Sequence, residues 1–271
     1  MVTADYNPRP RILRRYLDAH EGFSYLLRVP AAPDPERVLV LVHGIARQAS
    51  YMMHTLAEHA ERHGYTLVAP VFGYRYYEDY QRLGRRGRGK RADLALQAAM
   101  KDLRDHVGAG EYFHLFGFSG GAQFAHRYVY AWPDKVRTVT LAAAGWYTAP
   151  DPGVRFPYGT GQTAKLPELR FDARHLARVP TLTLVGDRDR VRDPALRQVD
   201  RVDFVQGRNR VARARWFHGA ISSLAEATDA GVEHGIEVLD NTAHDFGEAV
   251  YQGGLADKLF AFCERHSHTN S

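Results

Sequence analysis

Cysteine, lysine and long apolar runs are all scarce in this sequence. Cys263 is the single cysteine among 271 residues, so no internal disulfide can form, which is typical of a reducing compartment. No segment approaches the roughly 18–20 consecutive apolar residues that a membrane-spanning helix requires. The stretch at 1–22 lacks the apolar core of a secretory signal. These absences predict a cytoplasmic protein that does not associate with membranes.

Only five of the 36 basic residues are lysines, so arginine supplies almost all of the positive charge. Against 31 acidic residues the formal net charge is +5, and the densest basic run is RRGRGKR at 85–91. Such a run would attract phosphates or an acidic substrate, or it forms an ordinary solvated loop. Acidic residues are spread along the chain and no nucleic-acid-binding motif accompanies the run, so we expect no nucleic-acid partner.

Short apolar runs alternate with helix-like segments along most of the chain. The run RVLVLVH at 37–43 is continuous and β-branched, which is typical of a strand buried on both faces. The alternation predicts one α/β domain over 1–271, with a mostly parallel sheet of about eight strands covered by helices on both faces. The expected strands lie at 24–29, 37–43, 66–71, 112–118, 136–144, 181–185 and 235–239, and the main expected helices at 50–63, 92–107, 121–132 and 246–266.

One serine stands among glycines between an expected strand and an expected helix. The segment Gly117-Phe118-Ser119-Gly120-Gly121 matches G-x-S-x-G, in which a sharp turn lifts the serine hydroxyl above the sheet. Glycine at the flanking positions removes the clash that side chains would cause there. The alternative is an ordinary glycine-rich turn whose serine caps the helix. Reactive groups gather beyond the carboxyl ends of parallel strands, so partners that also follow strands favour the first interpretation.

A serine nucleophile needs a general base that an acid orients, and candidates for both follow later strands. His244 follows the expected strand at 235–239, and Asp187 and Asp189 follow the strand at 181–185. Most other histidines fall in expected helices or in the tail, where surface or packing roles are usual. The sequence therefore predicts Ser119 and His244 as nucleophile and base, with Asp187 or Asp189 as the acid.

The stretch His43-Gly44-Ile45 closes the expected strand at 37–43. Negative charge on a reacting carbonyl oxygen requires two preorganised donors, and the backbone N–H groups of Ile45 and Gly120 are the natural pair. We expect His43 to be structural and to bond to the backbone. The histidines and acids form no metal-spaced cluster such as H-E-x-x-H, so we expect neither a metal nor an organic cofactor.

Four segments, LVHGI, GFSGG, VGDRD and NTAHDF, together resemble the α/β-hydrolase superfamily over roughly 24–262. The stretch VHGIARQA is similar to the H-G-x-x-x-x-A pattern of polyhydroxyalkanoate-depolymerase-like and feruloyl-esterase-like members. The resemblance implies an α/β-hydrolase fold, and the family pattern G-x-x-D, matched by 186–189, implies Asp189 as the acid. It further implies a serine esterase that cleaves a small-molecule carboxylic ester through an acyl-enzyme.

Two other kinds of function stay open at this point. The same triad serves thioesterases, amidases, lactonases and acyltransferases, and a single sequence does not separate them. A catalytically inactive ligand-binding protein on the same scaffold belongs to a different class, and an intact serine, histidine and acid argue against it.

The chain departs from the superfamily in two segments that we interpret as insertions. One is short and cap-like, at 145–180, and the second, at 190–234, lengthens the spacing between Asp189 and His244 to 55 residues. Aromatic side chains in these segments and after the strand at 66–71 would line a substrate pocket, or they would only pack the loops. The expected pocket residues are Tyr74, Tyr76, Trp146, Tyr147 and Trp216.

Overall fold

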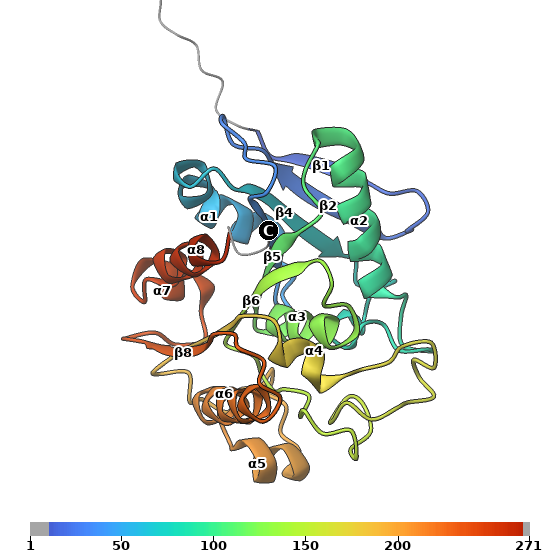
Figure 1. The fold of residues 1–271 in the computed structure, drawn as a ribbon, viewed down its shortest axis with the longest axis vertical. Coiled ribbons are helices and arrows are strands. Elements are labelled where there is room, and N and C mark those ends of the chain that lie inside the picture. Colours follow the sequence, from blue (N-terminus) through green and yellow to red (C-terminus); the bar gives the residue numbers. More distant parts are fainter. Residues whose placement is uncertain (1–10, 268–271) are drawn as a thin grey trace, which may run out of the picture.

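An eight-stranded sheet runs through the centre of the protein, whose computed structural model describes residues 11–267 (Figure 1). The strands are β1 (Leu13–Tyr16), β2 (Phe23–Arg28), β3 (Val38–Val42), β4 (Thr66–Phe72), β5 (Phe113–Phe118), β6 (Val136–Ala142), β7 (Thr181–Gly186) and β8 (His234–Leu239). They are ordered β1-β2-β4-β3-β5-β6-β7-β8. β2 is antiparallel to β1 and β4, and every other neighbouring pair is parallel. The predicted mostly parallel sheet of about eight strands is confirmed.

Helices cover both faces of this sheet. They are α1 (Ala49–Arg62), the 3-10 turn η1 (Tyr80–Arg82), α2 (Ala92–Val107), α3 (Gly120–Ala131), α4 (Ala173–Ala177), α5 (Asp200–Gln206), α6 (Arg210–Ala227), α7 (Phe246–Tyr251) and α8 (Leu255–Arg265). α1, α7 and α8 lie on one side, and α2, α3 and α4 on the other (Figure 1). α6 lies along β7 and β8 at one edge.

The two layers have separate hydrophobic cores because successive side chains of a strand point to opposite faces. Val38, Val40 and Val42 of β3 pack in the core that includes α2 and α3. Leu39 and Leu41 of the same strand pack in the core that includes α1, α7 and α8. All five side chains are fully buried, so β3 is the doubly covered strand that its continuous apolar run predicts.

The structure differs from the predicted elements at the two ends of the described chain. β1 was not predicted, because its LRRY sequence is mostly exposed and has no apolar alternation; Arg15 holds it to α2 through an ion pair with Asp102 at 2.6 Å. The single helix expected at 246–266 is two helices. Gly254, with φ +66, adopts a left-handed conformation directly before α8, so the helix does not continue from α7 into α8.

The second insertion contains the helices α5 and α6. Cys263 is buried on the inner side of α8. Within 11–267 the structure contains no helix with the length and apolarity of a membrane span. Positions 1–10, where no secretory signal was expected, and 268–271 of the predicted single domain lie outside the described residues.

Candidate active site

Three loops at the carboxyl edge of the sheet bring Ser119, Asp189 and His244 together. Ser119 follows β5, Asp189 follows β7 and His244 follows β8. These strands are parallel, so the residues that follow them emerge at the same edge.

The turn at Ser119 requires the glycines that flank it. Ser119 has φ 55 and ψ −110, a strained backbone conformation for a residue with a side chain. A Cβ at Gly121 would overlap the carbonyl oxygen of Val42, and one at Gly117 would overlap the backbone of Gly121. Although Ser119 is the N-cap residue of α3, its hydroxyl makes no capping hydrogen bond. The interpretation of this segment as a helix-capping turn is therefore wrong, and the hydroxyl points to another partner.

That partner is His244, which lies between the serine and an acid. The Nε2 atom of His244 is 3.0 Å from Ser119 Oγ, and its Nδ1–H donates to Asp189 Oδ2 at 2.7 Å. The His244 ring stacks on Phe118 with 5.4 Å between ring centroids, which fixes its orientation. Its side chain is 23% exposed whereas Asp189 is 1% exposed, so a ligand can reach the imidazole but not the carboxylate.

The structure distinguishes the two candidate acids. Asp189 bonds His244, whereas Asp187 accepts the backbone N–H of Thr242 at 3.0 Å on the other side of the turn. That bond lowers the pKa of Asp187 and ties the β7 and β8 loops together. Asp189 is therefore the acid in contact with the imidazole, and Asp187 has a local structural contact.

Arg210 of α6 holds the second oxygen of Asp189, a contact that sequence reasoning missed. Its Nη1 donates to Asp189 Oδ1 at 3.1 Å and to Asp193 Oδ2 at 2.7 Å, and both Arg210 and Asp189 are 1% exposed. The hydrogen bond from Arg210 holds the pKa of Asp193 at about 2. The arginine-rich start of α6 gave no sequence signal for this role, since an arginine in an insertion is usually solvated.

The predicted oxyanion donors lie on adjacent backbone segments. A Cβ at Gly120 would lie 3.0 Å from Ile45 Cγ2, and one at Gly44 would lie 4.0 Å from Ser119 Oγ. Within the described residues, the N–H groups of Ile45 and Gly120 bond to no backbone carbonyl. Gly120 is the first residue of α3, where an N–H lacks an intrahelical acceptor. The backbone segments that carry these two N–H groups therefore lie beside Ser119.

His43 is structural, as predicted. Its Nδ1–H donates to the Gly44 carbonyl at 2.9 Å, and its Nε2 accepts the N–H of Phe72 at 3.3 Å. Complete burial lowers the pKa of His43 to about 4, so the ring is neutral near pH 7. These two bonds fix the start of the loop that presents Ile45.

A pocket of about 180 Å³ opens beside Ser119; we call it the Ser119 pocket. Tyr51 and Met52 of α1 and Phe246 of α7 give it an apolar wall. Sequence reasoning missed these residues, although they directly follow the two loops that were identified. The lining residues are Gly44, Ile45, Ala46, Gln48, Tyr51, Met52, Phe118, Ser119, Ala195, His244, Asp245 and Phe246.

None of the five aromatic residues predicted to line the pocket does so. Trp146 and Tyr147 are buried, and Tyr147 stacks on Phe217 of α6 with 4.1 Å between ring centroids. Trp216 packs against the core on the α3 side of the sheet. The aromatic loops are covered by α6, so these side chains pack the insertions.

The other two lie outside the pocket on the β4 side. Tyr76 donates to Glu21 at 2.6 Å, away from the serine. Tyr74 is largely exposed, and its hydroxyl donates to the carbonyl of Ile45 at 3.2 Å. Tyr74 therefore contacts the loop that contains Ile45 from outside the pocket and does not line the pocket as predicted.

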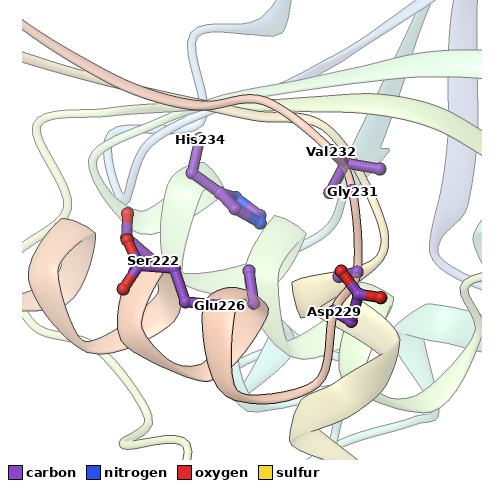
Figure 2. Close-up of a pocket in the computed structure, with 8 residues that line it drawn as sticks. Ser222, Glu226, Asp229, Gly231, Val232 and His234 are labelled. Atoms are coloured by element: carbon purple, nitrogen blue, oxygen red, sulfur yellow. The ribbon is translucent and has the colours of Figure 1, made fainter.

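A larger pocket of about 370 Å³ lies at the opposite edge of the sheet (Figure 2). It is formed by the end of α6 and by the loop that leads into β8, and His234 is the first residue of that strand. His244 follows the other end of β8, so this pocket does not belong to the site at Ser119. Over 11–267, no three His, Cys, Asp or Glu side chains are grouped to hold a metal ion.

Comparisons with known proteins agree with this architecture. Residues 37–191 match the sequence family described as alpha/beta hydrolase fold, and the match ends where the second insertion begins. None of the curated proteins matches the chain significantly.

Solved structures resemble most of the chain. Poly(aspartic acid) hydrolase-1 from Sphingomonas sp. KT-1 has a TM-score of 0.76 and 22% identity, covering 92% of this chain and 99% of that one. The poly(3-hydroxybutyrate) depolymerase from Bordetella parapertussis has a TM-score of 0.72 and 25% identity, covering 93% and 94%. An S-formylglutathione hydrolase from Agrobacterium tumefaciens has a TM-score of 0.61 and 15% identity, covering 94% of each chain.

Proposed function

Because the chain belongs to the alpha/beta hydrolase fold family, we propose that it is a serine hydrolase that cleaves carboxylic esters through an acyl-enzyme. One observation supports this most directly. The His244 ring lies 3.0 Å from Ser119 Oγ and 2.7 Å from the buried carboxylate of Asp189, at the strand ends where such sheets place reactive groups.

In the proposed reaction, Ser119 Oγ forms a bond to the ester carbonyl carbon while its proton moves to His244 Nε2. The carbonyl electron pair moves onto oxygen, where the N–H groups of Ile45 and Gly120 stabilise the negative charge. The carbon–alkoxy bond then breaks, and His244 returns the proton to the departing alcohol. A water molecule repeats these steps on the acyl-enzyme and releases the carboxylic acid.

The Ser119 pocket supports an ester substrate with a small apolar group at the reacting end. Tyr51, Met52 and Phe246 form a wall that would accept a short acyl chain or an aryl group. The similar structures include a poly(3-hydroxybutyrate) depolymerase and an S-formylglutathione hydrolase, which supports ester and thioester chemistry. The same groups would serve a thioester, an amide or a lactone, since the triad acts on the carbonyl in each case.

A fluorophosphonate probe tests the nucleophile, because it phosphonylates only an activated serine. We expect labelling of the wild-type protein and of Ser223→Ala, whose serine is exposed on α6, but none of Ser119→Ala. Hydrolysis of p-nitrophenyl acetate by Ser119→Ala should fall by a factor on the order of 10⁶. Undiminished labelling or turnover in Ser119→Ala would show that the nucleophile lies elsewhere.

The two aspartates test the acid in the same assay. Asp189→Asn should lower kcat by about 10⁴, because an amide supports the wrong imidazole tautomer. Asp187→Asn should change kcat far less, since the Asp187 carboxylate accepts the backbone N–H of Thr242 and does not bond His244. Equal losses in the two variants would contradict the assignment of Asp189.

A further inference from the structure

A second pocket at the carboxyl edge of the sheet, of about 370 Å³, has four arginines in its lining; we call it the arginine pocket. Its walls come from the loops that follow β4, β6 and β7, the same edge at which Ser119 lies. The lining residues are Glu78, Asp79, Arg82, Arg85, Arg88, Pro157, Tyr158 and Arg197.

Positive charge exceeds negative charge in the arginine pocket. Four arginines face two acids, and the buried carboxylate of Asp79 pairs with Arg82 and Arg85, each at 2.6 Å. In the described part of the chain, Arg88 and Arg197 form no ion pair. Arg201 adds another positive charge nearby, with its guanidinium 5.0 Å from the Tyr158 ring. The protein therefore neutralises only part of this charge.

The unpaired guanidinium of Arg197 is held in place, which separates it from an ordinary solvated arginine. The Nη2 atom of Arg197 donates to the Tyr158 hydroxyl at 2.5 Å, and its guanidinium carbon lies 5.4 Å from the centre of the Trp146 ring. Its Nε is buried without a hydrogen-bond partner. Burial, reinforced by the charges of Arg85 and Arg197 and opposed by Asp79, holds the pKa of neighbouring Arg82 below its ordinary value. Clustered like charges repel one another, and an anion bound among them would relieve that repulsion.

The basic run at 85–91 contributes only in part to this cluster. Arg85 and Arg88 line the arginine pocket, whereas Lys90 bonds Glu21 and Arg91 pairs with Asp93. Arg86 is exposed and does not line the pocket, so it offers a matched control within the same run.

Shared loops connect the arginine pocket to the Ser119 pocket. Ala195 lines the Ser119 pocket and Arg197 lines the arginine pocket, so their Cα atoms are at most about 7 Å apart. On the other wall, a Cβ at Gly120 would lie 3.0 Å from Gln81 Nε2, and the next residue is Arg82. One extended molecule can therefore occupy both pockets.

We propose that the arginine pocket binds an oxyanion, a carboxylate or a phosphate, that the substrate carries away from its scissile ester bond. The fork of N–H donors on arginine matches either group. This inference rests on the proposed function, and it defines the substrate class as esters with a second, anionic group. The anion neutralises the cluster and fixes the position of the ester carbonyl at Ser119.

Pairs of p-nitrophenyl esters test the substrate class. Each pair has the same acyl chain length, from four to ten carbons, and ends in a methyl group or in a carboxylate; a third series ends in a phosphonate. At one or more chain lengths, we expect kcat/KM for the anionic ester to be at least about tenfold higher than kcat/KM for the neutral ester of the same length. The preference should weaken with added salt because exposed charges are screened. Equal or lower kcat/KM for the anionic esters at every length would overturn the inference.

Arg197→Gln tests the pocket itself, through the ratio of anionic to neutral kcat/KM. The ratio should fall about tenfold in Arg197→Gln and partly recover in Arg197→Lys, which keeps the charge but not the fork. Arg86→Gln removes the same charge outside the pocket and should leave the ratio unchanged. Because both esters are assayed with the same enzyme sample, the ratio of their kcat/KM values does not change when a variant contains less folded protein. An equal fall in Arg86→Gln would overturn the specific role of the pocket.

The two proposals fail in different ways. If neutral esters depend on Ser119 but anionic esters show no preference, the proposed function stands and the inference is wrong. If Ser119→Ala retains turnover, the proposed function is wrong, and calorimetric titration with glutarate and with inorganic phosphate tests the pocket alone. Binding that Arg197→Gln abolishes and Arg86→Gln keeps supports the anion site, and absence of binding to the wild-type protein overturns it.

Discussion

The carboxylate of Asp189 is divided between two partners, one for each oxygen. Oδ2 accepts from His244, and Oδ1 accepts from Arg210 at 3.1 Å. Asp189 and Arg210 are both buried, so neither water nor a rotamer change readily replaces the contact between them. Because Arg210 belongs to the second insertion, a segment outside the family match helps to hold the proposed acid.

Arg210 is therefore expected to act as a positioning residue. Arg210→Gln should lower kcat about 10- to 100-fold with little change in KM, because a looser Asp189 orients His244 less well. Arg210→Lys should recover part of kcat. Arg192→Gln, which removes an ion pair with Asp203 in the same insertion, is the control and should leave kcat near wild type. Steady-state kinetics measure both parameters, and a rise in KM at constant kcat would contradict this role.

At this scale the sequence identified the residues whose roles depend on a strand end. Ser119 and His244 follow strands that their apolar runs reveal, so their positions follow from the fold. Asp187 and Asp189 follow the same strand, and only the direction of each side chain in the turn separates them. Arg210 comes from a helix with no recognisable pattern. Long-range contacts of this kind depend on how an insertion packs, which local sequence does not specify.

At the scale of elements, the strand–turn–helix unit of β5, Ser119 and α3 depends on close backbone approach. Gly121 lies against the carbonyl of Val42, and Gly117 lies against Gly121 itself. The neighbouring atoms belong to the backbone of β3 and α3, so they cannot move aside as a flexible side chain would. The spacing between β3 and α3 is therefore set by the absence of side chains at these positions.

Two glycine substitutions test this reasoning with opposite expected results. Gly121→Ala should lower the free energy of unfolding by several kcal/mol, because its Cβ would force β3 and α3 apart. Gly219→Ala, in the middle of α6 with nothing within 4 Å of a new Cβ, should raise it by about 0.5–1 kcal/mol. Urea unfolding followed by circular dichroism measures both values. A neutral Gly121→Ala would show that the turn tolerates a side chain.

Element prediction succeeded where apolar periodicity was strong. The helix expected at 92–107 matches α2 at both ends, and the strands of the parallel part shift by no more than two residues. β1 was missed because an edge strand with exposed side chains has no burial pattern to detect. The division of the last helix depends on the left-handed conformation of Gly254. Glycine permits this conformation but does not require it, so the sequence does not indicate where the helix divides.

For the molecule as a whole, both cores include histidines that are kept neutral by burial. His43 lies on one face of the sheet against Tyr80, and His114 lies on the other against Tyr65. Burial lowers the pKa of His43 to about 4 and that of His114 to about 3, and it places the pKa of His126 well below 6.5. Each ring has hydrogen-bond partners that suit its neutral form.

These histidines predict that the fold weakens in mild acid. Below pH 6.5 the unfolded chain binds protons that the native state does not accept until the pH approaches 4 or 3, so native stability is lost as pH falls through that window. By pH 5, His43 and His114 should each lower the free energy of unfolding by about 2 kcal/mol relative to pH 7. Urea midpoints at pH 7, 6 and 5 measure this loss for the whole protein.

His114 is remote from Ser119 and bonds Thr138 at 2.8 Å, so the variant His114→Gln isolates the contribution of this histidine to the loss of stability. The variant should start less stable at pH 7 but lose about 2 kcal/mol less than the wild type on acidification to pH 5. Parallel losses in the two proteins would show that His114 does not remain neutral in the folded state.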